Sequence, residues 1–144
     1  MTTKEYLNQA YRLDQRINSK LEQVTALSSL ATKVTATLTG MPKSSNRPTS
    51  LMSDTINKIF DLQSEINKDI DQLVDLKREI VGAIRLVTST ESQTLLEKRY
   101  LCFETWEQIA VDMSYSIQHI YRIRDRAIDE LTLIRKKMIG NESK

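Results

Sequence analysis

The chain has 144 residues, of which 40% are hydrophobic and 28% are charged, and its formal net charge is only +2. This composition is ordinary for a soluble folded protein, no apolar run approaches the roughly 18 residues of a membrane-spanning helix, and we expect a cytoplasmic protein. One cysteine and one histidine exclude a disulfide framework and a His/Cys metal site, and the scarcity of glycine and proline favours long helices.

The first expected element is a long helix from about Thr3 to Leu38, which no proline or glycine interrupts before Gly40. Nine of its ten heptad positions are apolar, Lys20 being the exception, and this pattern is typical of a coiled-coil seam. The ten positions are Tyr6, Ala10, Leu13, Ile17, Lys20, Val24, Leu27, Ala31, Val34 and Leu38.

A second long helix is expected from about Leu51 or Ser53 to Val87, after a loop at residues 40–50 that holds both prolines. Eight of its ten heptad positions are apolar. They are Ile56, Ile59, Gln63, Ile66, Ile70, Leu73, Lys77, Ile80, Ile84 and Val87. Two helices of similar length joined by a short connection predict an antiparallel, coiled-coil-like hairpin.

The hairpin is expected to need a further partner. Additional apolar residues, among them Phe60 and Leu62, make the apolar stripe of the second helix wider than a single seam requires. We therefore expect residues 1–88 to be an oligomerisation region, most simply that of a homodimer. Docking of the C-terminal module onto the stripe and a plain structural spacer are the alternatives.

Residues 89–144 form the second expected domain, which contains three shorter helices. The segments Thr88–Glu91 and Thr105–Gln108 have the spacing of capping boxes, which mark helix starts. A short helix over Trp106–Met113 leads through a turn to a last helix that Ser116 caps. The expected fold class is therefore all-α, a long helical hairpin followed by a tri-helical module.

The last two helices have the pattern of a helix-turn-helix. Ala110 supplies the small residue where the helices cross, and apolar residues fill the angle between them. The apolar residues are Ile109, Met113, Tyr115, Ile120 and Ile123. The turn, Met113 to Ser116, has serine where glycine is usual, and serine adopts that conformation at some cost. Trp106 and Cys102 are expected in the core.

The last helix is the one expected to enter the major groove of DNA. Glutamine and arginine make bidentate contacts to base edges, and Ile117 can touch a thymine methyl group. The expected DNA-binding residues are Ser116, Ile117, Gln118, His119, Tyr121, Arg122, Arg124, Asp125 and Arg126. Between Ser116 and Ile139, six Lys or Arg stand against three Asp or Glu, which suits phosphate contacts without very tight non-specific binding. An ordinary solvated face and a protein-binding surface are the alternatives.

The segment Leu95–Leu131 resembles region 4 of the sigma-70 factors. The matching residues are Leu96, Arg99, Tyr100, Thr105, Trp106, Glu107, Ile109, Ala110, Ser116, Ile120, Ile123, Arg126, Ala127, Ile128 and Leu131. In that family the residues just after the turn read the promoter −35 element. The resemblance implies that Ser116, Ile117, Gln118, Tyr121 and Arg122 read bases here.

The whole chain is also similar to a family of small phage and prophage proteins of Gram-positive hosts, through Thr2–Val24 and Asp71–Ile80. This similarity implies a regulator that a phage or mobile element encodes. No segment resembles sigma region 2, so we do not expect the chain to melt a promoter.

The leading hypothesis is a sequence-specific transcription regulator that binds double-stranded DNA as a homodimer, with half-sites about 34 Å apart or a multiple of that. One alternative is a phage DNA-packaging or other DNA-site recognition protein. The other is a factor that binds host RNA polymerase or a host defence protein. No glycine-rich phosphate loop or paired catalytic residues stand in the sequence, so we expect neither an enzyme nor a cofactor.

Overall fold

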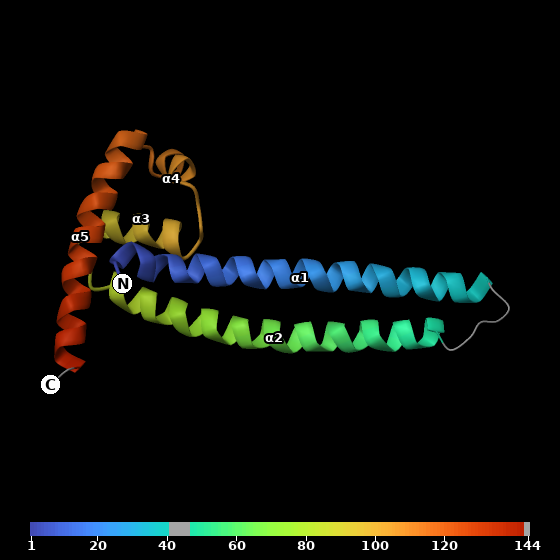
Figure 1. The fold of residues 1–144 in the computed structure, drawn as a ribbon. Helices are drawn as coiled ribbons and strands as arrows, with labels where there is room; N and C mark the ends of the chain where they lie inside the picture. The colour runs from blue at the N-terminus through green and yellow to red at the C-terminus, as the bar shows by residue number, and fades with distance from the viewer. Residues whose placement is uncertain (41–46, 143–144) are drawn as a thin grey trace. The chain divides into compact units, whose positions relative to one another are not determined.

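The computed structural model describes residues 1–40 and 47–142, with side chains described for residues 1–33 and 50–140. The described residues form five helices and no strand, which confirms the predicted all-α class (Figure 1). The helices are α1 (Thr3–Gly40), α2 (Arg47–Ile84), α3 (Thr90–Tyr100), α4 (Trp106–Met113) and α5 (Ile117–Glu142).

The bounds of α2 differ from the predicted ones at both ends. The helix begins at Arg47, earlier than Leu51 or Ser53, so residues 40 and 47–50 of the expected loop are helical, and residues 41–46 lie outside the described residues. It ends at Ile84 rather than Val87 because the chain tightens there, the Val87 N–H donating to the Ile84 carbonyl at 3.0 Å.

The chain divides into two compact units, and the division does not fall at residue 88. The terminal unit comprises Met1–Leu13 and Leu73–Lys144, and the hairpin unit comprises Asp14–Gln72. The first part of α1 and the last part of α2 therefore belong with α3, α4 and α5 rather than with the rest of the hairpin.

Apolar residues from all five helices make the core of the terminal unit. The buried residues are Leu7, Ala10, Leu73, Ile80, Ala83, Ile84, Val87, Leu95, Leu96, Tyr100, Ile109, Ala110, Ile120, Ile123, Ala127 and Leu131. Polar contacts join the same segments, since the Thr3 and Thr132 hydroxyls lie 2.6 Å apart and the Arg135 guanidinium donates to Thr3 Oγ1 at 3.3 Å. This shared core is the physical reason why the ends of the two long helices group with the three short helices, and the predicted boundary between domains at residue 88 stays a prediction.

Ser89, and not Thr88, caps α3. The Ser89 hydroxyl accepts a hydrogen bond from the Ser92 N–H at 3.3 Å, while the Thr88 N–H donates to the Glu130 carboxylate of α5 at 2.8 Å. The capping box predicted at Thr88 and Glu91 is therefore wrong, because the Glu130 carboxylate occupies the Thr88 N–H and the helix is capped one residue later by Ser89 alone.

Within the hairpin unit, α1 and α2 run antiparallel and side by side (Figure 1). Their buried seam contains Ile17 and Ile66, as predicted, together with Thr55 and Asp69. The Lys20 ammonium group donates to Asp69 Oδ2 at 2.6 Å.

Three of the predicted heptad positions of α2 do not belong to this seam. Ile56, Gln63 and Ile70 are exposed, so their assignment to the hairpin contact is wrong. The Lys20–Asp69 pair accounts for the rotation of α2 about its own axis, because it places Asp69 rather than the neighbouring Ile70 toward α1.

No helix among the described residues combines the length and the apolar character needed to cross a membrane.

Asp69→Ala should lower the free energy of unfolding by about 1–3 kcal/mol, because it removes the hydrogen-bonded carboxylate of the poorly hydrated Lys20 ammonium group and leaves only the exposed Glu65 carboxylate, 3.6 Å away. Urea denaturation followed by circular dichroism measures the change. The double variant Lys20→Met/Asp69→Leu removes both charges and should recover most of the loss. A double variant as unstable as Asp69→Ala would count against this explanation.

Candidate nucleic-acid interface

Side-chain caps and one left-handed residue define the turn between α4 and α5. The Thr105 hydroxyl accepts from the Gln108 N–H at 3.2 Å at the start of α4, and Ser116 Oγ accepts from the His119 N–H at 3.2 Å at the start of α5. Ser114 has φ 60° and ψ 39°, which is the left-handed conformation. These contacts confirm that the Ser116 cap begins the last helix and that serine fills the turn position where glycine is usual.

The angle between α4 and α5 is filled largely as predicted. Ile109, Ala110, Ile120 and Ile123 are all buried. Tyr115 is an exception, since it is 40% exposed and its ring meets the edge of the His119 ring at 4.4 Å between centroids. The nearby Glu91 carboxylate raises the pKa of the Tyr115 phenol, and this side chain does not fill the core.

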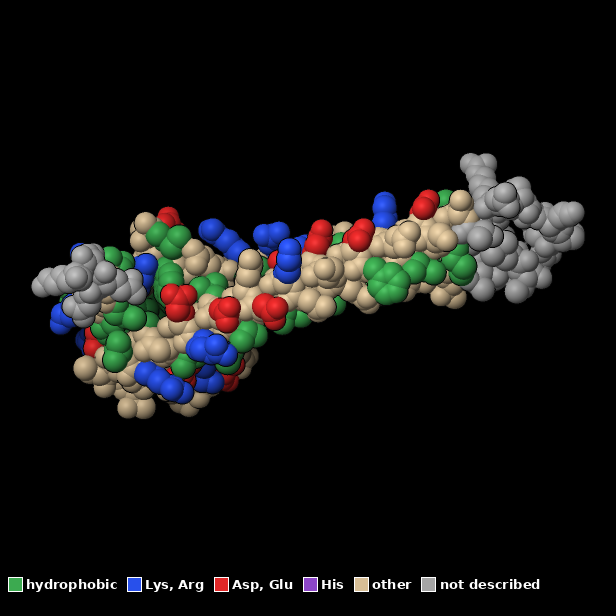
Figure 2. Space-filling model, turned by 90° about the horizontal axis from the view of Figure 1, so that it is seen from below, with side chains coloured by type: hydrophobic (Ala, Val, Ile, Leu, Met, Phe, Trp, Pro, Cys, Tyr) green, Lys and Arg blue, Asp and Glu red, His purple; other side chains and the backbone are tan. Residues whose placement is uncertain are grey.

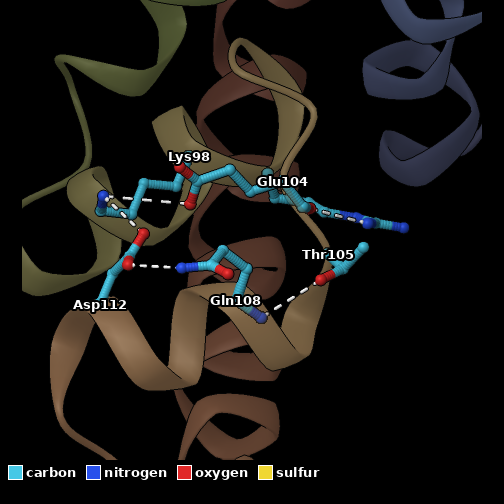
Figure 3. Close-up of polar contacts among 6 residues, drawn as sticks. Lys98, Glu104, Thr105, Gln108 and Asp112 are labelled. Carbon is cyan, nitrogen blue, oxygen red and sulfur yellow. Dashed lines mark hydrogen bonds and ion pairs between the residues drawn. The ribbon is translucent and has the colours of Figure 1, made fainter.

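A polar cluster joins α3 to α4 (Figure 3). Lys98 Nζ lies 3.4 Å from Asp112 Oδ2 and 3.9 Å from Glu104 Oε2, and Gln108 Nε2 donates to Asp112 Oδ1 at 2.8 Å. The Glu104 oxygen is buried without a hydrogen bond, so the Lys98 charge is what compensates it. Hydrogen bonds from Gln108 and Lys98 outweigh desolvation and lower the pKa of Asp112.

No sequence pattern predicts this cluster. Its members come from three separate segments, and no periodic spacing connects Lys98 with Asp112. The capping box predicted at Thr105 and Gln108 is confirmed only in its first half, because the Gln108 side chain bonds Asp112 and not the Thr105 backbone.

Trp106 lies at the meeting point of α3, α4 and α5. Its ring is 4.8 Å from the Arg99 guanidinium carbon and 5.6 Å from that of Arg124, and the Tyr121 ring meets it edge-on at 6.2 Å. The ring is half-buried, so it serves as a platform for cations rather than as a core residue alone. Cys102, also expected in the core, is exposed.

Contacts inside the protein hold several of the predicted DNA-binding side chains. The Arg124 guanidinium lies over the Tyr121 ring at 4.6 Å and donates to Asp125 Oδ1 at 3.0 Å. Tyr121, Arg124, His119 and Ile117 are half-buried. Arg124 therefore contacts α4 through the Trp106 ring, 5.6 Å away, and its charge is shared with Asp125.

The other predicted residues are exposed. These are Ser116, Gln118, Arg122, Asp125 and Arg126. Gln118, Arg122 and Arg126 follow one another at intervals of four residues and so lie along one side of α5. Among the described residues, neither Arg122 nor Arg126 has an ion-pair partner, so both guanidinium groups are available to a ligand.

Comparison of the chain with protein-family models, with curated proteins and with solved structures finds no match. The resemblance to sigma region 4 stays a prediction from the residues, and a function can be inferred only from the side chains of the site, because a fold alone does not imply one. Within the described part of the chain, no three His, Cys, Asp or Glu side chains are grouped so that they could hold a metal ion.

Ser114→Gly should raise the free energy of unfolding by about 0.5–1 kcal/mol. The left-handed conformation costs an L-residue roughly 1–2 kcal/mol, and this gain exceeds the larger entropy that glycine loses on folding. Ser116→Gly is the matched control, because Ser116 has no positive φ, and it should lower stability by a few tenths of a kcal/mol. Changes of the same sign in both variants would contradict the strain at Ser114.

Asp112→Asn should remove a contribution to stability that depends on pH. Because the folded-state pKa of Asp112 is lowered, its contribution is complete above about pH 3.9, the ordinary pKa of aspartate, and is lost as the pH falls through the lowered value. Denaturation curves from about pH 6 to about pH 3 should show the two proteins converging in stability. Gln108→Met, which removes the main cause of the lowered pKa, should show the same trend. A difference in stability between the variants and the unsubstituted chain that stays constant with pH would contradict this role of Asp112.

Proposed function

We propose that the chain binds double-stranded DNA sequence-specifically through the N-terminal half of α5 and acts as a transcription regulator. One observation carries the proposal. Gln118, Arg122 and Arg126 form an exposed row on the second helix of a capped helix-turn-helix, and the two arginines have no ion-pair partner among the described residues. A helix placed in this way is the element that enters the major groove in DNA-binding helix-turn-helix proteins.

The chemistry of the exposed row suits base edges. The Arg122 guanidinium can donate two hydrogen bonds to guanine O6 and N7, and the Gln118 amide can pair with adenine N6 and N7. Ser116 lies at the tip of the helix, where base contacts concentrate. Gln118 and Arg122 are one helical turn apart, so they suit base pairs close together in one groove.

Phosphate contacts would come from fewer cations than the sequence contains. Arg124 is paired with Asp125, and Arg135 lies over the Tyr6 ring at 4.3 Å, so both are engaged inside the protein. Lys136 and Lys137 remain exposed. Because few cations are free to contact phosphates, we expect the affinity for non-specific DNA to be modest. Contacts to base edges would then contribute the larger part of the affinity for a specific site. A phage or mobile-element origin rests on the sequence resemblance.

Selection of bound duplexes from a random DNA library, followed by gel shift with the full chain, tests the proposal. Arg122→Ala should weaken binding of the selected site about tenfold or more, since a bidentate base contact contributes about 1–3 kcal/mol. The control is Arg16→Ala, which removes the same charge from an exposed position of the hairpin unit and should leave affinity nearly unchanged. No enriched sequence, or equal effects of the two variants, would falsify the assignment.

A further inference from the structure

A row of exposed side chains runs along α2 within the hairpin unit, outside the seam with α1. We call it the outer row, and it consists of Ile56, Phe60, Gln63, Asn67 and Ile70. Phe60 is 63% exposed, and Ile56 and Ile70 are each 41% exposed. Hydrophobic side chains form a visible cluster on the surface of the hairpin in Figure 2.

The spacing of the outer row is that of a coiled-coil seam. Successive members are separated by four, three, four and three residues, which is the alternation that keeps side chains on one face of a helix facing a partner helix. The seam with α1 uses other residues, such as Thr55, Ile66 and Asp69. The helix α2 therefore carries two faces with seam-like spacing, and α1 covers only one.

The outer row has no charged member, in a chain of which 28% of the residues are charged. A face without charge does not suit a nucleic acid, whose binding depends on cations. It does suit the centre of a protein interface, where charged residues are depleted. Two copies of this face meet without like-charge repulsion.

The spacing of the four central members of the outer row is the same in both directions along the helix, and each end has an apolar residue followed by an amide. Phe60, Gln63, Asn67 and Ile70 are separated by three, four and three residues. Two such helices related by a two-fold axis and running antiparallel would place Phe60 against the partner's Ile70. The same axis would place the Gln63 amide opposite the partner's Asn67, where the two amides can exchange hydrogen bonds. A two-fold interface requires a surface that is complementary to itself in this way.

We propose that the outer row is the contact surface for a second copy of this chain, with the two α2 helices antiparallel. Phe60 and Ile70 supply the apolar contact, and the central amide pair fixes the register, since a polar residue in a seam is satisfied only opposite another polar group. Ile56 extends the contact at each end. The proposal does not depend on DNA binding, because it uses none of the residues of α5.

The oligomeric state of the full chain tests the proposal first. Sedimentation equilibrium should show a concentration-dependent dimer, and Phe60→Lys should shift the mass to that of a monomer with unchanged helical circular dichroism. Ile70→Lys should do the same. Leu51→Lys is the matched control, because Leu51 is 52% exposed on the same helix but outside the outer row, and the dimer should persist. A monomer for the unsubstituted chain, or a dimer for Phe60→Lys, overturns the proposal.

Crosslinking then tests the orientation. In a Cys102→Ser background, chains with Gln63→Cys are mixed with chains with Asn67→Cys and oxidised mildly. The antiparallel register should give mainly the mixed disulfide between the two kinds of chain. A parallel register would instead give disulfides between identical chains, and that result would overturn the proposed geometry.

Discussion

The arrangement of the terminal unit depends on the burial of one apolar row along α5. Ile120, Ile123, Ala127 and Leu131 are each at most 3% exposed, and their spacing of three and four residues follows the turn of an α-helix. Burial of this row fixes the rotation of α5 about its own axis. The side of α5 that carries Arg122 must then face solvent, so the apolar core decides which polar side chains a ligand can meet.

Features that depend on a few neighbouring residues could be predicted from the sequence. The Ser116 cap and the left-handed serine in the turn are of this kind, because the groups that satisfy the backbone are close in the chain. The rotation of α2 could not be predicted in this way. Ile56 and Ile70 fit a heptad seam as well as the residues actually buried, and the ion pair between Lys20 and Asp69, 49 positions apart, distinguishes the two.

In the candidate site, too, contacts between residues far apart in the chain could not be predicted from the sequence. Sequence reasoning predicted the last helix and the exposed positions along it, because helical periodicity separates inward from outward positions. It did not separate the available arginines from the engaged ones. Arg124 and Arg122 are two residues apart on α5, yet Arg124 lies over aromatic rings of α4 and α5 and Arg122 does not. That difference is created by the packing of Trp106, which no local pattern reveals.

The position of Trp106 has an optical consequence. It is the only tryptophan of the chain, and its indole lies between guanidinium groups of α3 and α5. Indole emission responds to nearby charge and to water, so the tryptophan fluorescence of this protein arises at the junction of α3, α4 and α5. The emission of this single indole therefore reports on the packing of that junction and requires no attached dye.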